Sequence, residues 1–366
     1  MEDSNKKTCL YEKHVALGAQ MSPFGGFDMP IQYEGIVEEH NAVRNKCGVF
    51  DVSHMGEVLI SGPEAEKYVS YLFSNDTRDG ADGQCFYGMM LNEKGGVVDD
   101  LLVYKIDTRN YFLVINASNI DKDVAWIRKN AEGFDVTVDN LSDNLGELAV
   151  QGPEAESVVE EVLGLPCADL GFYTFKMLTV DGEEVTVSRT GYTGEDGFEI
   201  YASHDLTRRF WDKLMESGRC KPCGLGCRDT LRFEAGLPLY GNELADDISP
   251  LEATLSMFVK LDRPDFLGRQ ATVDLKAAGV KRKSVGLELA DKAIPRHGYE
   301  VLDENDEVIG HVTTGYHSIT LDKSIAMAMI DARYAKVGTP LKVRIRRKTF
   351  PVTVVKKSFY KKNYKN

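Results

Sequence analysis

The chain has 366 residues, of which 43% are hydrophobic and 28% are charged, and its formal net charge at pH 7 is −13. That length exceeds what one hydrophobic core usually organises, so two or three domains are expected. The negative charge argues against binding of nucleic acid or of an anionic membrane surface, because contact with phosphates needs a positive field.

The chain carries no obvious targeting or membrane segment. No apolar run approaches the roughly 20 residues that a membrane span requires. The first eight residues have neither the apolar core of a signal peptide nor the Arg-rich character of a transit peptide. Seven cysteines are too few, and of the wrong parity, for a disulfide framework. We therefore expect a cytoplasmic protein with free thiols.

A strand-to-helix motif occurs twice in the first half of the chain. Residues 57–66 (Glu-Val-Leu-Ile-Ser-Gly-Pro-Glu-Ala-Glu) recur as residues 147–156 (Glu-Leu-Ala-Val-Gln-Gly-Pro-Glu-Ala-Glu). In each copy Gly suits the N-cap of the helix, Pro suits its first position, and the glutamates complement the helix dipole. A second echo relates residues 112–119 to residues 198–204, each before an amphipathic helix. We infer two related β-α-β-β-β-α units with a ligand-binding cleft between them.

Beyond about residue 285 the hydrophobic pattern changes to the alternation of antiparallel β structure. The segments that alternate with period two are residues 285–289, 307–312, 341–345 and 351–355. Turn-forming residues 303–306 connect two of these strands as a hairpin would. The pattern predicts a small barrel or a jelly roll.

The end of the chain is strongly basic, in contrast to the rest. Residues 341–366 contain ten Lys or Arg and no Asp or Glu. Lysines on a solvated strand edge prevent aggregation, and this structural interpretation is about as good as a functional one. The functional interpretation is a site for an anion or an acidic partner.

Several common signals of enzyme chemistry are absent or weak. The chain has no Gly-x-Gly-x-x-Gly, no phosphate-binding loop, no His-Glu-x-x-His and no Gly-x-Ser-x-Gly. Cys220, Cys223 and Cys227 have a metal-like spacing but no fourth ligand nearby, so buried structural thiols are favoured. His54 could be a base or a structural histidine among apolar neighbours.

Two adjacent carboxylates interrupt an apolar strand pattern at residues 97–103. Period-two alternation sends Asp99 and Asp100 to opposite faces of the strand, so one of them must point inward or into a cleft. A carboxylate in such a place is costly unless it is paired or used. The pattern favours a functional role over a structural ion pair.

Taken together, several ordered motifs resemble the aminomethyltransferase (T-protein) family of the glycine cleavage system. Two glycine-punctuated segments, residues 189–199 and 222–236, carry acids, arginines and an aromatic side chain. The other matching segments are residues 23–27 (Pro-Phe-Gly-Gly-Phe), 50–56 (Phe-Asp-Val-Ser-His-Met-Gly), 95–100 (Gly-Gly-Val-Val-Asp-Asp) and 239–243 (Leu-Tyr-Gly-Asn-Glu). The resemblance spans nearly the whole chain.

The resemblance implies an α+β fold, a three-domain cloverleaf with tetrahydrofolate in a central hole. The expected domains are residues 1–50 with 141–280, residues 51–140, and a C-terminal barrel-like domain of residues 281–366. The implied reaction passes the methylene group of an aminomethyl-lipoyl arm, carried by H-protein, to tetrahydrofolate with release of ammonia. No metal is required, because nitrogen and sulfur already activate the carbon.

The resemblance also implies which residues act, position by position. Asp99 is expected beside the reactive folate nitrogens, where its charge would stabilise an iminium cation. Glu199 and Arg228 are expected to contact the folate. The remaining expected folate-binding residues are Tyr192, Asn116, Met55 and Tyr87, with Arg296 and Tyr364 from the C-terminal domain. The chain departs from the family pattern at Ile319 and Cys227, which lie outside this set.

Two other functions within the same fold family remain open at this stage. One is a folate-dependent demethylase of a small methylated substrate, against which the glycine-cleavage motifs argue. The other is a non-catalytic folate-binding protein. Proteins of that kind carry a Lys-Gly-Cys-Tyr-x-Gly-Gln type of segment, whereas this chain has Gly-Leu-Gly-Cys-Arg-Asp at residues 224–229.

Overall fold

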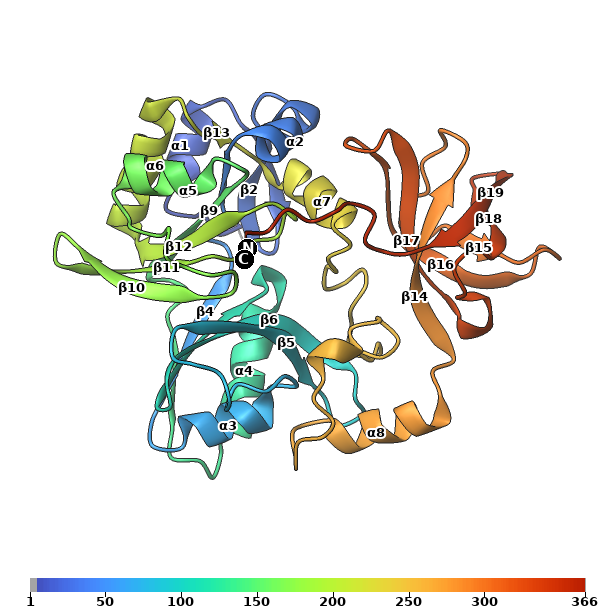
Figure 1. Cartoon of the computed structure of the whole chain (residues 1–366), viewed down its shortest axis with the longest axis horizontal. Helices are drawn as coiled ribbons and strands as arrows, with labels where there is room; N and C mark the ends of the chain where they lie inside the picture. The colour runs from blue at the N-terminus through green and yellow to red at the C-terminus, as the bar shows by residue number, and fades with distance from the viewer. Residues whose placement is uncertain (1–4, 366) are drawn as a thin grey trace.

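The computed structural model describes residues 5–365, which form three lobes (Figure 1). Two lobes are α+β units built around separate sheets, and the third is a β-barrel, drawn in orange to red. Helix α7 (Leu225–Glu234) lies between the first unit and the barrel and contacts both. Among residues 5–365 no helix is long and apolar enough to cross a membrane.

The first unit is organised by a six-stranded sheet in the order β10-β11-β12-β9-β3-β13. Its strands are β3 (Gly48–Asp51), β9 (Leu145–Gln151), β10 (Phe175–Val180), β11 (Glu183–Ser188), β12 (Gly197–Ser203) and β13 (Lys221–Pro222). Its other elements are α1 (Tyr11–Ala16), the hairpin β1 (Gln20–Phe24) and β2 (Phe27–Gln32), α2 (Ile36–Asn45), α5 (Ala155–Val158), η2 (Val159–Leu163) and α6 (His204–Ser217). The apolar face of α6 buries Phe210 and Trp211 against Phe198 of the sheet.

The second unit has a five-stranded sheet in the order β5-β6-β7-β4-β8. Its strands are β4 (Gly56–Ser61), β5 (Gln84–Leu91), β6 (Val97–Asp107), β7 (Asn110–Ile115) and β8 (Thr137–Asn140). Its helices are α3 (Ala65–Leu72), η1 (Ala117–Asn119) and α4 (Ile120–Asn130). Tyr68 of α3 and Ile127 of α4 are fully buried in one core with Leu113 of β7. One face of the sheet is therefore covered by helices, and the other is left for the rest of the molecule.

The two units repeat the same path, as the sequence echoes predict. In each, a strand (β4 or β9) leads into a helix (α3 or α5) and then into three antiparallel strands, which place their last member beside the first. The expected helix start is wrong by two residues, because α3 and α5 begin at Ala65 and Ala155. Gly62 and Gly152 are turn residues with φ of 142° and 129°. A Cβ at either position would lie 2.4 Å from a backbone oxygen, so these glycines allow a close approach rather than capping a helix.

The C-terminal lobe is a closed six-stranded barrel in the order β14-β17-β16-β15-β18-β19. Its strands are β14 (Arg282–Leu289), β15 (Glu300–Leu302), β16 (Val308–Ser318), β17 (Lys323–Asp331), β18 (Pro340–Ile345) and β19 (Lys348–Val355), with η4 (Ala332–Tyr334) after β17. Antiparallel pairing of β15 with β16 confirms the predicted hairpin at residues 303–306. Pairing of β19 with β14 closes the barrel, so no strand edge remains open.

The segment between α7 and the barrel packs on the second unit. Leu244 and Phe266 lie in one cluster with Met89 and Val97 of β5 and β6. The backbone N–H of Val97 donates to the carbonyls of Ala245 and Ile248, at 3.1 and 3.0 Å. Helices η3 (Ser256–Phe258) and α8 (Arg269–Ala278) complete this segment. This segment therefore packs on the second expected domain and also contacts the barrel, through Met329 and the Glu252–Arg282 pair, although the expected domains place it with the first. The domain boundaries stay a prediction.

Candidate active site

A cavity of about 1170 Å³ lies where the two α+β units meet α7, the barrel and the C-terminal tail. Its walls come from β5, β6 and β7 of the second unit, from β9 and β12 of the first, from α7 and from β16. Much of the lining is apolar or aromatic, including Leu102, Val114, Phe172, Tyr173, Phe258 and Tyr316. The cleft expected between the duplicated units is therefore present, and the barrel side closes it further.

Most of the side chains expected from the sequence meet in this cavity. The expected residues that line it are Met55, Tyr87, Asn116, Tyr192, Glu199, Arg228 and Tyr364. Arg296 is not among the residues that line it. Its side chain is exposed, with its guanidinium carbon 5.2 Å from the centre of the Tyr316 ring, and Tyr316 does line the cavity.

The two adjacent carboxylates of β6 have different surroundings. Asp99 is fully buried and lies outside the cavity lining. Its carboxylate accepts hydrogen bonds from the backbone N–H of Asn116 (3.0 Å), from Nδ2 of Asn116 (2.9 Å) and from Nδ2 of Asn119 (2.7 Å). Asp100 lines the cavity, where it accepts from the Tyr87 hydroxyl (2.9 Å) and from Asn116 Nδ2 (3.0 Å).

This arrangement decides which carboxylate a ligand in the cavity would meet. Strand alternation predicts that only one of the pair reaches the cleft, and the geometry favours Asp100 over Asp99. Burial, and then the negative charge of Asp99, raise the pKa of Asp100 to about 7, while hydrogen bonds from Tyr87 and Asn116 act in the opposite direction. Asp100 is therefore a carboxyl group poised to change its charge near neutral pH.

The part of the cavity wall formed by β12 and α7 carries a buried acid and a partly buried guanidinium cation. Glu199 of β12 accepts a hydrogen bond of 2.5 Å from the Thr190 hydroxyl. Burial raises the pKa of Glu199, and the nearby guanidinium of Arg228 opposes that rise. Arg228 lies in the first turns of α7, with its guanidinium carbon 4.8 Å from the centre of the Tyr192 ring. Within residues 5–365 its Nη1 has no hydrogen-bond partner, so it is available to a bound acceptor.

Comparisons with known proteins decide the family. The profile of the GCVT N-terminal domain family matches residues 10–263, and that of the glycine cleavage T-protein C-terminal barrel domain matches residues 282–361. This chain belongs to the glycine cleavage T-protein family. The recognition made from the motifs is confirmed.

Relatives of this T-protein family member are similar over their whole length. An aminomethyltransferase of Caldanaerobacter subterraneus subsp. tengcongensis is 50% identical over 99% of this chain and 98% of its own. One of Alkaliphilus oremlandii is also 50% identical, over 98% and 99%. The crystal structure of glycine cleavage system aminomethyltransferase T from Bartonella henselae superposes with a TM-score of 0.95, at 34% identity and 99% coverage of both chains. The expected α+β cloverleaf fold and the expected class of enzyme, a one-carbon transferase, are confirmed.

Sequence reasoning missed one buried carboxyl group of the T-protein cavity. Glu147, at the start of the second strand-to-helix motif, lines the cavity and is 2% exposed. Burial, followed by the charge of Glu199, raises its pKa well above the ordinary value. Glu57, at the corresponding position of the first motif, is fully buried, and neither of its carboxylate oxygens has a partner in the described part of the chain. An acid at the start of an apolar strand, repeated in both echoes, was the signal that could have found them.

His54 also lines the cavity, and its buried surroundings keep its imidazole ring uncharged at neutral pH. Its ring packs edge-on against Phe24, with ring centres 5.6 Å apart. Burial, together with the charge of Arg228, lowers the pKa of His54 to about 4, although Asp51 opposes the shift. The imidazole is therefore neutral at neutral pH.

The cysteine cluster at residues 220–227 is built as a structural core. All seven cysteines lie in the described residues and are free thiols. Cys223 and Cys227 approach the carboxylate of Glu39 closely enough to resemble a metal site. That carboxylate is already occupied, because it accepts from the backbone N–H of Tyr33 at 2.6 Å and of Gly224 at 2.8 Å. The favoured interpretation of buried thiols agrees with this geometry.

The basic tail returns from the barrel to the first unit (Figure 1), and part of it lines the cavity. The backbone N–H of Tyr360 donates to Glu234 O and that of Asn363 to Gly194 O, each at 2.8 Å. The Tyr364 ring then stacks on Phe172, with centres 4.1 Å apart. Tail lysines that line the cavity are Lys357 and Lys362. Burial lowers the pKa of Lys357 to about 8.

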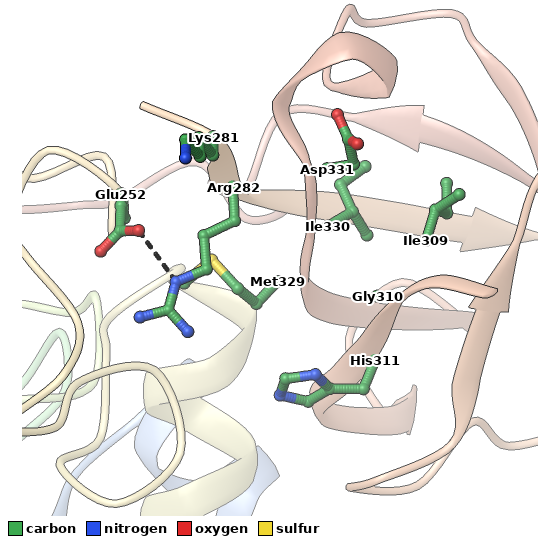
Figure 2. A pocket seen from close by; sticks show the side chains of 9 residues that line it. All are labelled: Glu252, Lys281, Arg282, Ile309, Gly310, His311, Met329, Ile330 and Asp331. Carbon is green, nitrogen blue, oxygen red and sulfur yellow. Dashed lines mark hydrogen bonds and ion pairs between the residues drawn. The ribbon is translucent and has the colours of Figure 1, made fainter. Parts of the chain in front are cut away.

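A second, smaller pocket of about 480 Å³ lies on the barrel and holds none of the expected site residues (Figure 2). Its walls include Arg282, His311, Met329 and Asp331. The guanidinium of Arg282 is already paired with the carboxylate of Glu252 at 2.8 Å, as the dashed line in Figure 2 marks. The candidate chemistry is therefore concentrated in the large cavity.

Proposed function

We propose that this protein transfers the methylene group of the aminomethyl-lipoyl arm of H-protein to tetrahydrofolate, with release of ammonia. The observation that carries the proposal is a cavity lined by all three lobes, with the carboxyl group of Asp100 on the second unit and those of Glu199 and Glu147 on the first. Its volume of about 1170 Å³ exceeds the roughly 300–1,000 Å³ of common small-molecule pockets. That size suits a site that brings two reactants together.

Recognition of the pterin ring is assigned to the Glu199 side of the cavity. A pterin carries an amide N–H beside an amino group, which together form a donor edge that a carboxylate can accept. Arg228, whose Nη1 has no partner in the structure as described, supplies a donor for a pterin oxygen or nitrogen. Tyr192, Met55 and Tyr87 supply aromatic and apolar surface around the ring.

Asp100 is assigned as the carboxylate beside the reacting carbon. Breaking the carbon–sulfur bond leaves its electron pair on sulfur, which takes a proton to become the lipoyl thiol, and leaves an iminium cation on the aminomethyl group. A folate nitrogen attacks that carbon, ammonia departs, and the second folate nitrogen closes the methylene bridge with loss of a proton. A negative charge next to the cation lowers the barrier, because the attraction is larger in the transition state than in the ground state.

Asp99, Arg296 and the tail have supporting roles in this proposal. Asp99 holds Asn116, which contacts Asp100, and so acts behind the reacting carboxylate. Arg296 lies outside the cavity lining but next to Tyr316, within reach of a substrate that extends past the barrel. Lys357 and Lys362 place positive charge where a folate glutamate or an acidic surface of H-protein could bind.

The proposal is tested by mixing the chain with aminomethyl-loaded H-protein and tetrahydrofolate and by measuring ammonia release. We expect release that depends on both components, with formation of methylene-tetrahydrofolate in equal amount. Dimethylglycine or dimethylsulfoniopropionate in place of H-protein provides the control. Activity with these free substrates, and none with loaded H-protein, would establish a demethylase instead. Folate binding without turnover of any of them would establish a binding protein.

A further inference from the structure

A third buried carboxyl group stands behind the two acids of β6. Asp123, in the first turns of α4, has no exposed surface. No hydrogen-bond donor among residues 5–365 reaches either of its carboxylate oxygens. The side chain of a second acid, Asp99, lies within hydrogen-bonding reach of the Asp123 carboxyl group. Two ionised carboxylates cannot hydrogen-bond to each other, since both only accept, so a hydrogen bond between these two requires a proton on one of them.

The hydrogen bonds of the two partners indicate which one holds the proton. Asp99 accepts three N–H donors, from Asn116 and Asn119, and a carboxylate with two or three such donors is stabilised in its charged form. Asp123 accepts none, and it is buried beside the charge of Asp99. The neutral member is therefore Asp123, which donates its proton to Asp99.

The other charged and titratable groups around Asp123 do not reverse this assignment. On its own helix the ammonium of Lys122 is 3.9 Å from Asp123 Oδ1, too far for a hydrogen bond. That ammonium instead donates to the Val98 carbonyl and, at 2.9 Å, to the Tyr240 hydroxyl. The helix start weakly favours a negative charge. On β6, Asp99 and Asp100 both oppose it, and burial is the largest cause of the raised pKa of Asp123, about 11.

This acid pair connects directly to the carboxylate that faces the cavity. Nδ2 of Asn116 contacts Oδ1 of Asp99 at 2.9 Å and Oδ1 of Asp100 at 3.0 Å. A fixed Asp99 therefore fixes Asn116, which in turn fixes Asp100. Because one of the three acids is neutral, Asp100 has a single negative charge behind it rather than two.

We propose that Asp123 and Asp99 share one proton as a buried acid pair which, through Asn116, positions the carboxylate of Asp100 and limits the negative charge behind it. Asp123 is thus a positioning residue, because it acts only through Asp99 and Asn116. The inference rests on the proposed function for its effect on catalysis. The shared proton itself does not depend on any activity.

The first test is an infrared difference spectrum of the chain alone at neutral pH, wild type minus Asp123→Asn. Both proteins are labelled with carbon-13 aspartate, so that glutamate bands do not move. We expect a carboxylic acid C=O band that shifts with the label and is lost in the variant. Absence of that band overturns the shared proton, whether or not the chain is an aminomethyltransferase. Asp121→Asn, an exposed acid in the same turn of α4, is the matched control and should leave the carboxylic acid C=O band in place, with loss of ionised carboxylate bands alone.

The second test is the pH dependence of kcat/KM for Asp123→Asn and Asp123→Ala. Asparagine is neutral and donates an N–H to Asp99, so its acid-limb midpoint should match that of the wild type. Alanine cannot donate a hydrogen bond to Asp99, so kcat/KM of Asp123→Ala should fall about 10- to 100-fold. Asp123→Asn should not show this loss. If Asp123 were ionised, asparagine would remove a charge and lower the midpoint by on the order of one pH unit. That downward shift, or equal losses in both variants, would overturn the positioning role.

Discussion

Replacing the cavity carboxylate is the sharpest test of the proposed chemistry. In Asp100→Asn the side chain keeps its size but loses the charge next to the iminium cation. At about 4 Å and an effective dielectric near 20, that attraction is roughly 4 kcal/mol. Because about 1.4 kcal/mol corresponds to a factor of ten, and because the amide dipole retains part of the attraction, we expect kcat/KM to fall about 100- to 1000-fold.

The pH dependence of the same variant gives a second signature. The raised pKa of Asp100, about 7, predicts that wild-type kcat/KM declines as pH falls through neutrality, since protonation removes the charge. His54 does not produce this decline, because its pKa is near 4. The residual activity of Asp100→Asn should therefore be flat over the range in which the wild type declines.

The thermal stability of Asp100→Asn shows whether a loss of activity comes from lost chemistry or from a misfolded protein. The folded pKa of Asp100 lies above its unfolded value of 3.8, so the folded chain binds more protons and loses stability as pH rises between the two values. Asp100→Asn lacks this cost and should melt no lower than wild type at pH 8. Stopped-flow ammonia release and thermal melts are the two assays. Asp139→Asn, on the exposed edge strand β8 of the same sheet, is the control.

The contrast with the neighbouring acid decides where the reacting charge lies. Strand alternation left Asp99 and Asp100 as alternatives, and the resemblance pointed to Asp99. If Asp99→Asn abolishes turnover while folded Asp100→Asn retains most of it, the electrostatic argument is refuted and the charge acts from the buried position.

Three further predictions concern two residues of the cavity, Glu199 and Tyr364, and the buried acid Glu57, which lies outside the cavity lining. Glu199→Gln should weaken tetrahydrofolate binding about 10- to 100-fold, since it loses a charge-assisted pair of hydrogen bonds, and a fluorescence titration that shows unchanged affinity would contradict this. Glu57→Gln should reduce the loss of melting temperature as pH rises above about 4.5, because burial raises the folded pKa of Glu57 and its ionisation destabilises the fold. Equal pH slopes in the two proteins would show that this carboxyl group is not desolvated. Tyr364→Ala should raise the KM for tetrahydrofolate about 2- to 10-fold by removing the ring stacked on Phe172, and Tyr364→Phe should restore it.

Local patterns predicted the elements and their order because each depends on near neighbours. The echo of residues 57–66 in residues 147–156 revealed the duplication, and period-two alternation beyond residue 285 revealed the barrel. The start of α3 was missed because the φ of Gly62 is set by the approach of Asp135 from a distant segment. Packing of residues 244–267 on the second unit depends in the same way on contacts between segments that are distant in the sequence.

The sequence by itself determined the family, the duplicated fold and seven of the residues that line the cavity, because those are carried by ordered motifs and by local periodicity. Only the tertiary structure decided that Asp100 rather than Asp99 faces the cavity, since alternation says that two neighbours diverge but not which side is covered by helices. It also brought Asp123 of α4 against Asp99 of β6, a contact between separate elements. The charge of a buried carboxyl group depends on such neighbours, which are defined only once the chain has folded.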